Sequence, residues 1–181
     1  MEETEKMTPK KAVAVLRNRE GLDEDKIGYG NEKALNQMLA HHGIVFQPED
    51  LLVWVSSNPY QMGEFVAYDL KDVFSNKKKG NASVAKSELN IAKDPFLETD
   101  SYAKYESYRI LSRTVSSYIA SGKHLDKRVL NTFKLSNPEF WEVYYLVGKY
   151  YLGKGYDTLA TREPIQALCH QDRLGFSSHK K

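Results

Sequence analysis

Cysteine is nearly absent from this sequence, and so are long apolar runs and an excess of charge of either sign. The single cysteine, Cys169, excludes an internal disulfide and any zinc site built from several cysteines. No run approaches the roughly eighteen apolar residues of a membrane-spanning helix. The net charge is only +2, from 26 basic and 24 acidic residues. We therefore expect no nucleic-acid partner and no membrane span, while the cellular compartment stays open.

The size and composition are those of a globular protein. The chain has 181 residues, 41% of them hydrophobic and 28% charged, which suits one ordinary domain or a small domain with an appendage. Its one concentrated basic run is Lys77, Lys78 and Lys79, beside asparagine and glycine. Such a run is typical of a solvated loop.

The first forty residues predict two short helices separated by a polar loop. Thr8 is a suitable N-cap, and Pro9 suits the first helical position because its missing N–H would be unpaired there in any case. After the glycine-containing loop of residues 20–30, apolar residues recur at helical spacing within 31–39. We expect the second helix there.

Three β-strands are predicted next, at residues 43–47, 51–57 and 65–70, because these stretches are rich in β-branched and aromatic residues and are separated by turns that contain proline. The middle stretch is apolar on both faces, so we expect it to be covered on both sides. A lone hairpin is marginal in water. This pattern therefore predicts that the strands belong to a larger sheet.

From Asp94 onward the sequence predicts only helices. The expected segments are 99–121, ended by Gly122; 124–133; 137–152, with Asn137 as the cap and proline next; and 157–171, kinked at Pro164. The fold class we expect is therefore α+β, with a hairpin or partial sheet followed by an all-helical C-terminal extension.

No set of residues forms a self-sufficient catalytic group. Cys169 and His170 are neighbours, but consecutive helical side chains point about 100° apart, and a nucleophile needs its base within hydrogen-bonding reach. His41 and His42 stand where a helix meets the first strand, and adjacent strand residues point to opposite faces. A metal site would need carboxylate or cysteine partners, which are lacking nearby. We expect no catalytic residue, no metal and no cofactor.

Two further patterns have structural interpretations that are favoured over functional ones. Gly28 and Gly30 before Asn31 look superficially like a phosphate-binding loop, but the dinucleotide and P-loop motifs need more glycines and a preceding strand. A turn with an asparagine cap is the better interpretation. The aromatic run at Trp141, Tyr144, Tyr145, Tyr150 and Tyr151 is more typical of a helix–helix core than of a ligand-stacking surface.

The last sixty or so residues resemble one tetratricopeptide unit. Gly148 falls at the small position of the first helix, Gly155 on the turn, and Ala160 and Ala167 on the second helix. Pro164 departs from the family, which has a large aromatic residue there. Since three repeats are normally needed for a stable solenoid and three cannot be counted, a helical hairpin that merely packs like this unit is an equal alternative.

A more extensive resemblance covers about residues 8–70. Residues 31–37 (NEKALNQ), 40–46 (AHHGIVF) and 54–70 (WVSSNPYQMGEFVAYDL) resemble the C-terminal end of acyl-CoA:6-aminopenicillanic-acid acyltransferase-like proteins. These are cysteine N-terminal-nucleophile hydrolases, related to choloylglycine hydrolases. The resemblance rests on the sequence pattern of this region and not on a chemical motif.

That resemblance implies a four-layer αββα fold in which residues 42–70 supply late strands of one sheet. The family's nucleophile is a cysteine exposed as a chain N-terminus, with its own α-amino group as the base. Cys169 does not match that position, so no catalytic residue carries over. His41, His42, Asn58 and Tyr60 are the candidate substrate-pocket residues.

The expected organisation is a C-terminal piece of an αββα hydrolase-like domain at 1–72, a polar linker at 73–93 and a helical extension at 94–176. The expected function is the C-terminal portion of an acyltransferase or amide hydrolase without its nucleophile, inactive alone. Its partners would be the missing N-terminal part of the same enzyme and a small-molecule amide or acyl substrate. The alternative is a helical, tetratricopeptide-like protein-interaction module.

Overall fold

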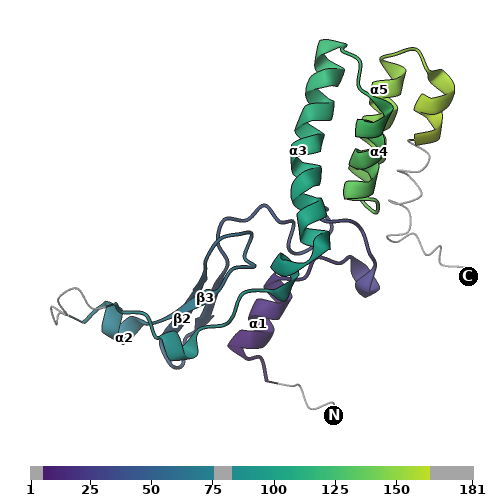
Figure 1. Ribbon diagram of the computed structural model, residues 1–181. Helices are drawn as coiled ribbons and strands as arrows, with labels where there is room; N and C mark the ends of the chain where they lie inside the picture. Colours follow the sequence, from purple (N-terminus) through teal and green to yellow (C-terminus); the bar gives the residue numbers. More distant parts are fainter. Residues whose placement is uncertain (1–5, 76–82, 164–181) are drawn as a thin grey trace, which may run out of the picture. The chain divides into compact units, whose positions relative to one another are not determined.

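The computed structural model describes residues 6–75 and 83–163, and the chain divides into two compact units (Figure 1). The sheet unit comprises Met1–Asn18 and Met38–Leu97, and the helical unit comprises Arg19–Gln37 and Glu98–Lys181. Strands and helices are both well represented, so the expected α+β class is confirmed.

The sheet unit contains a three-stranded antiparallel sheet in the order β1-β2-β3. The strands are β1 (Ile44–Gln47), β2 (Leu52–Ser56) and β3 (Phe65–Asp69). The three strands predicted from the sequence are therefore confirmed to within two residues. Val45 pairs with Trp54, and Trp54 pairs with Ala67, so these three side chains share one face of the sheet.

Helix α1 (Pro9–Leu16) packs on that face. Its predicted N-cap is confirmed, because the Thr8 hydroxyl accepts a hydrogen bond from the Lys11 N–H at 3.3 Å and Pro9 opens the helix. The helix contributes the fully buried Val13, with Ala12 and Leu16 partly buried beside it. The core of the unit is Val13, Val45, Trp54, Phe65 and Ala67.

The opposite face of the sheet is covered incompletely. The register places the alternate residues of all three strands on it, from Ile44 and Phe46 in β1 to Val53 in β2. Val53 is buried, but Ile44 is 50% exposed and Phe46 is 64% exposed. Val53 is thus buried, as expected for a strand covered on both sides, whereas β1 leaves apolar surface in contact with solvent.

The two edges of the sheet differ. Along β3 runs a segment that includes the 3-10 turn η2 (Ser87–Leu89), and Phe65 and Ile91 exchange two backbone hydrogen bonds of 2.9 and 3.0 Å. Helix α2 (Leu70–Val73) continues from β3, and the 3-10 turn η3 (Pro95–Glu98) follows later. In the described ranges, no strand pairs with the outer edge of β1.

The helical unit is built on three helices that pack against one another (Figure 1). They are α3 (Asp100–Ser121), α4 (Lys127–Ser136) and α5 (Trp141–Leu152). The predicted ends of α3 are confirmed: the Thr99 hydroxyl accepts from the Tyr102 N–H, and Gly122 adopts the left-handed conformation. The buried side chains include Tyr105, Tyr108, Val115, Leu130, Phe133, Phe140, Val143, Val147 and Tyr150. Residues 157–163 are again helical.

The helix predicted at residues 31–39 is wrong. Residues 19–37 form turns instead, and they include one short 3-10 turn, η1 (Leu22–Glu24). The buried Asn31 side chain donates to the Ile27 carbonyl at 2.7 Å and accepts from the Lys33 N–H at 2.9 Å, which closes a local turn in place of a helical one. Met38, with φ of 51°, lies in the left-handed region and ends any helical continuation.

Two later helix boundaries also differ from the prediction. Helix α5 begins at Trp141 and not after Asn137, because the Asn137 amide is bonded to another segment of the chain. Helix α4 is displaced by three residues toward the C-terminus. The lysine run at 77–79, the proline kink at 164, and Cys169 with His170 lie outside the described residues.

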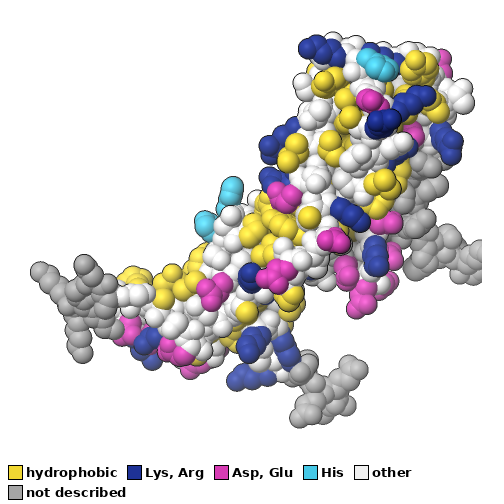
Figure 2. Space-filling model, in the orientation of Figure 1, with side chains coloured by type: hydrophobic (Ala, Val, Ile, Leu, Met, Phe, Trp, Pro, Cys, Tyr) yellow, Lys and Arg dark blue, Asp and Glu magenta, His cyan; other side chains and the backbone are white. Residues whose placement is uncertain are grey.

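Helix length and apolar character decide whether the described residues include a candidate membrane span. Not one of the helices there is both long enough and apolar enough to cross a bilayer. On the face shown in Figure 2, basic and acidic side chains are interspersed, which agrees with the small net charge.

Candidate functional site

The four residues predicted to line a substrate pocket lie at one end of the sheet. His41 and His42 precede β1, while Asn58 and Tyr60 follow β2. At this open end of the hairpin, the last pair joined by hydrogen bonds is Gly43 and Ser56. The Ser56 N–H donates to the Gly43 carbonyl at 2.9 Å, and the Gly43 N–H donates to Ser56 Oγ at 2.7 Å. The fold therefore brings the two pairs to the same end, which we call the sheet-end group. His41, His42 and Asn58 are exposed, and Tyr60 is half-buried.

The loop that carries Asn58 and Tyr60 has a tightly fixed backbone. Tyr60 and Gln61 both have positive φ, 50° and 65°, an uncommon conformation for side chains of this size. A Cβ on Gly63 would lie 2.4 Å from the Asn58 carbonyl oxygen. The backbone that carries Asn58 and Tyr60 therefore has a constrained conformation.

Arg17, at the end of α1, holds this loop from within the sheet unit. Its Nη2 donates to the Gly63 carbonyl at 2.8 Å and the Ala92 carbonyl at 2.9 Å, and its Nε donates to the Gln61 carbonyl at 3.3 Å. The guanidinium carbon also lies 5.3 Å from the centre of the Phe65 ring. One side chain thus ties α1, the β2–β3 loop and the segment beyond β3 together.

The chemistry that the sheet-end group offers is hydrogen bonding and not nucleophilic attack. It has imidazole, amide and phenol groups, but no serine or cysteine paired with a base. Within residues 6–75 and 83–163, no three His, Cys, Asp or Glu side chains are grouped in the way that metal ligands are. The group can therefore orient a polar substrate but does not by itself supply a catalytic centre.

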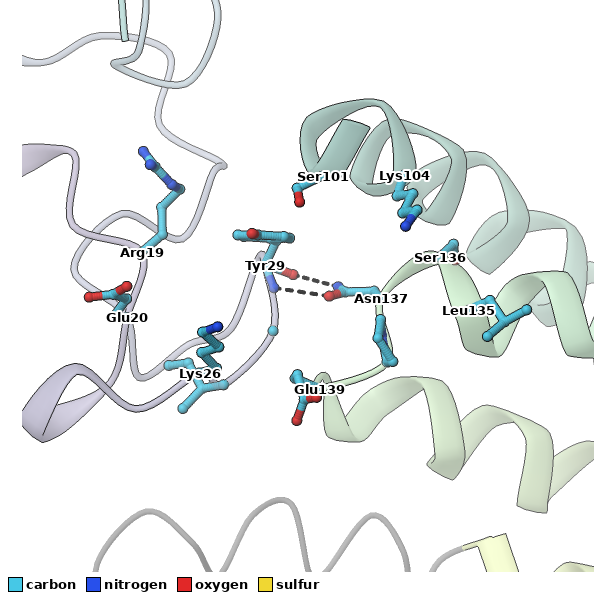
Figure 3. A pocket seen from close by; sticks show the side chains of 13 residues that line it. Arg19, Glu20, Lys26, Tyr29, Ser101, Lys104, Leu135, Ser136, Asn137 and Glu139 are labelled. Carbon is cyan, nitrogen blue, oxygen red and sulfur yellow. Dashed lines mark hydrogen bonds between the residues drawn. The ribbon is translucent and has the colours of Figure 1, made fainter. Parts of the chain in front are cut away.

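A second candidate is a pocket of about 250 Å³ in the helical unit (Figure 3). We call it the helical-unit pocket. Its walls come from the loop of residues 19–29, the first turns of α3 and the α4–α5 connection. Its lining residues are Arg19, Glu20, Lys26, Ile27, Gly28, Tyr29, Ser101, Lys104, Leu135, Ser136, Asn137, Pro138 and Glu139.

Two close contacts fix the walls of this pocket. The buried Asn137 side chain accepts from the Tyr29 N–H at 3.0 Å and donates to the Tyr29 carbonyl at 2.7 Å, as the dashed lines in Figure 3 show. Gly28, with φ of +80°, lies against Phe140 so closely that a Cβ there would come within 2.5 Å of it. The loop of residues 26–29 is thus seated firmly on the α4–α5 connection.

An aromatic cluster lies behind the pocket. The Tyr29 ring meets Tyr105 edge to face, Tyr105 stacks on Tyr108, and Tyr108 stacks on Phe133. The Tyr108 hydroxyl donates to a carboxylate oxygen of Glu142, and burial raises the pKa of Tyr108 well above its usual value. The cluster stabilises the wall that holds Tyr29, and Tyr108 stays a neutral hydrogen-bond donor at physiological pH.

The aromatic run of α5 divides between core and surface. Tyr150 is buried, and its hydroxyl accepts from the Leu125 N–H at 2.9 Å, whereas Tyr145 is 46% exposed. Trp141 donates from Nε1 to the Glu32 carboxylate at 3.1 Å. The core interpretation therefore holds for Tyr150 but not for Tyr145.

Sequence reasoning did not find the helical-unit pocket. Its walls are joined by Tyr29 and Asn137, which are 108 residues apart in the sequence, and Lys26, Ser101 and Lys104 belong to no motif. The only local signal was the pair Gly28 and Gly30, which the sequence analysis interpreted as a turn. Both glycines do have positive φ, of 80° and 83°, so the turn is confirmed while its place beside a pocket was missed.

Comparison with known proteins gives no relative: no protein-family model, no curated protein and no solved structure matches this chain significantly.

Proposed function

We propose that this chain is the C-terminal portion of an amide-cleaving or acyl-transferring enzyme of the N-terminal-nucleophile class, similar to the acyl-CoA:6-aminopenicillanic-acid acyltransferase-like proteins. The observation that carries the proposal is a sheet with a helix on one face and exposed apolar side chains, Ile44 and Phe46, on the other. In an αββα fold, each sheet has helices on its outer face and a second sheet on its inner face. The exposed face has the character expected of such an inner face.

The open edge of β1 supports the same proposal. Because Gly43 and Ser56 form a hydrogen-bonded pair, Val45 and Gln47 point their backbone groups toward β2, and Ile44 and Phe46 point theirs outward. Phe46 also lines a groove of about 550 Å³, to which Met7 and Pro9 contribute from the start of α1. An added strand at this edge would satisfy the outward backbone groups and cover Phe46.

In the proposed enzyme this chain supplies structure and substrate contacts, and the nucleophile lies on the missing N-terminal part. A cysteine thiolate at the start of a chain, deprotonated by its own α-amino group, would attack the amide or thioester carbonyl. The C–N or C–S bond breaks, the amine or thiol leaves with the proton, and an acyl-enzyme remains. The acyl group then passes to water or to an amine. His41, His42, Asn58 and Tyr60 are the residues we assign to the substrate pocket, and no catalytic residue is assigned to this chain.

Capture from the native cell tests the proposal directly. Antibody capture, intact-mass measurement and N-terminal sequencing should recover the chain within a longer polypeptide, or tightly bound to a chain that begins with cysteine. Recovery alone at 20.7 kDa would overturn the proposal.

A charge on the open face provides a test in the recovered assembly. Phe46→Asp should weaken association with the N-terminal part by at least tenfold, because it places a carboxylate in a contact that buries an aromatic side chain. Phe74→Asp is the matched control, since Phe74 is 78% exposed and lies at the end of α2, which follows β3, and not on the open edge of β1. Equal affinities for the two variants would contradict the role of this face.

The second candidate is a helical, tetratricopeptide-like interaction module. It is favoured by the burial of Val147 and Gly148 on α5 and of Ala160 on the next helical segment, since such units pack two helices closely through small residues. If the chain is recovered alone, capture of a peptide or protein partner that is lost on Gly148→Leu, but not on Gly153→Ala, would support it.

A further inference from the structure

We propose that the helical-unit pocket binds a small organic carboxylate with an apolar body. This site lies wholly within the helical unit, and the proposal does not depend on the enzyme class argued above. It rests on three properties of the pocket: fixed walls, uncommitted positive charge and a largely apolar lining.

The walls are fixed before any ligand arrives. Asn137 holds both backbone groups of Tyr29, and Gly28 leaves no space between its backbone and Phe140. The Tyr29 ring is held in turn by its edge-to-face contact with Tyr105. Little ordering is therefore needed on binding, which is the condition that lets a small ligand use its few contacts for affinity.

The charges that remain available in the pocket are positive. In the part of the chain that the structure describes, the ammonium groups of Lys26 and Lys104 have no hydrogen-bond or ion-pair partner. The two acidic residues of the lining, Glu20 and Glu139, are already engaged in interactions, as is Arg19. A ligand therefore meets two unpaired cations and no unpaired anion.

The two lysines reach the pocket from different walls. Lys104 descends from α3 toward Asn137, and Lys26 points from the opposite wall toward Tyr29 (Figure 3). Ser101, in the first turn of α3, offers a hydroxyl on the same wall as Lys104. The N-terminus of α3 adds to the positive potential on this wall, so a carboxylate beside Lys104 would gain from both. Lys26 adds a longer-range attraction from the other wall.

The rest of the lining favours an apolar body over a bare inorganic anion. Ile27 and Tyr29 contribute from the loop of residues 19–29. Leu135 and Pro138 contribute from the end of α4 and the connection after it, with Leu135 70% exposed in spite of its size. Cavities of roughly 150 Å³ hold a benzene ring, so the 250 Å³ here is adequate for a ring that carries one carboxylate. Benzoate is the appropriate probe.

The test is a titration of the ¹⁵N-labelled full chain with benzoate, benzamide and inorganic phosphate, followed by the backbone amide signals. Benzoate should give saturable shifts at Tyr29 and Ser101, and neutral benzamide should bind at least about fivefold more weakly because it cannot pair with the lysines. Lys104→Gln should weaken benzoate binding by about fivefold, and Lys26→Gln should weaken it by less. Lys123→Gln, which removes the same charge just beyond the far end of α3, should leave it unchanged.

Three results would overturn the proposal. They are the absence of saturable benzoate shifts at these residues, benzamide binding as tightly as benzoate, and a loss of affinity in Lys123→Gln equal to that in Lys104→Gln. Phosphate binding as tightly as benzoate would overturn the apolar part of the proposal and leave only a site for small anions. All three lysine side chains are exposed, so the variants should keep the amide spectrum of the folded chain.

Discussion

Replacing Arg17 with methionine should destabilise the sheet unit selectively. The substitution keeps most of the aliphatic stem but removes the guanidinium, which makes short hydrogen bonds to the Gly63 and Ala92 carbonyls and a longer one to the Gln61 carbonyl. A charged hydrogen bond contributes about 1.5 kcal/mol where solvent partly reaches it, so the two short bonds together give about 3 kcal/mol. For a unit of this size, that loss lowers the melting temperature by roughly 15 °C.

The two tryptophans of the chain make the assay specific. Trp54 is buried in the sheet unit and donates to the Leu89 carbonyl at 2.9 Å, whereas Trp141 belongs to the helical unit. In a Trp141→Phe background, urea unfolding followed by tryptophan emission therefore reports on the sheet unit alone. The Arg17→Met transition should move to lower urea by the equivalent of about 3 kcal/mol.

The controls separate the hydrogen bonds from the charge. Arg17→Lys keeps the charge but reaches fewer carbonyls, so its loss should lie between those of the wild type and Arg17→Met. Arg113→Met, on an exposed position of α3, should change the free energy of unfolding by less than about 0.5 kcal/mol. A cost below about 1 kcal/mol for Arg17→Met would refute the view that this side chain holds the β2–β3 loop in place.

Two further predictions concern the helical unit. Gly28→Ala should lower the free energy of unfolding by about 3 kcal/mol, because the new Cβ meets Phe140 at 2.5 Å. Gly155→Ala, with a similar φ but open space around it, should lower it by only about 1 kcal/mol. Thermal melts followed by circular dichroism would detect this difference, and equal losses would contradict the contact. Burial raises the pKa of Tyr108 above that of the unfolded chain, so its contribution is fully present below the unfolded value of about 10 and is lost as the pH rises above it. The free energy of unfolding should therefore fall above about pH 10, and less steeply in Tyr108→Phe; parallel pH profiles would contradict the assignment.

The sequence allowed prediction where local rules and tertiary packing act together. Thr8 and Thr99 cap helices, Gly122 ends one in the left-handed conformation, and the three strands occur where β-branched and aromatic residues predict them. In these segments, the residues that favour the local structure are also the residues that the core needs.

Prediction failed where contacts distant in sequence decide the local structure. At residues 31–39 the helical spacing of Leu35, Met38 and Leu39 is misleading, because Leu35 and Leu39 are 58% and 66% exposed and only Met38 is buried. The Asn31 side chain closes a turn there, which hydrophobic periodicity does not reveal. The sheet-end group could be proposed from the resemblance because its members adjoin two paired strands. The helical-unit pocket depends on the contact between Tyr29 and Asn137, and no local pattern predicts that contact.

The discontinuous helical unit has a consequence for synthesis on the ribosome. Residues Arg19–Gln37 belong to this unit, but its next member begins at Glu98, about 60 residues later. At roughly 5–20 residues per second, the early segment emerges several seconds before the helices against which Ile27 and Tyr29 pack. During that interval its apolar side chains have no native surface to cover them. Slow codons between residues 38 and 97 should therefore increase capture of the nascent chain by chaperones, whereas slow codons before residue 19 should not.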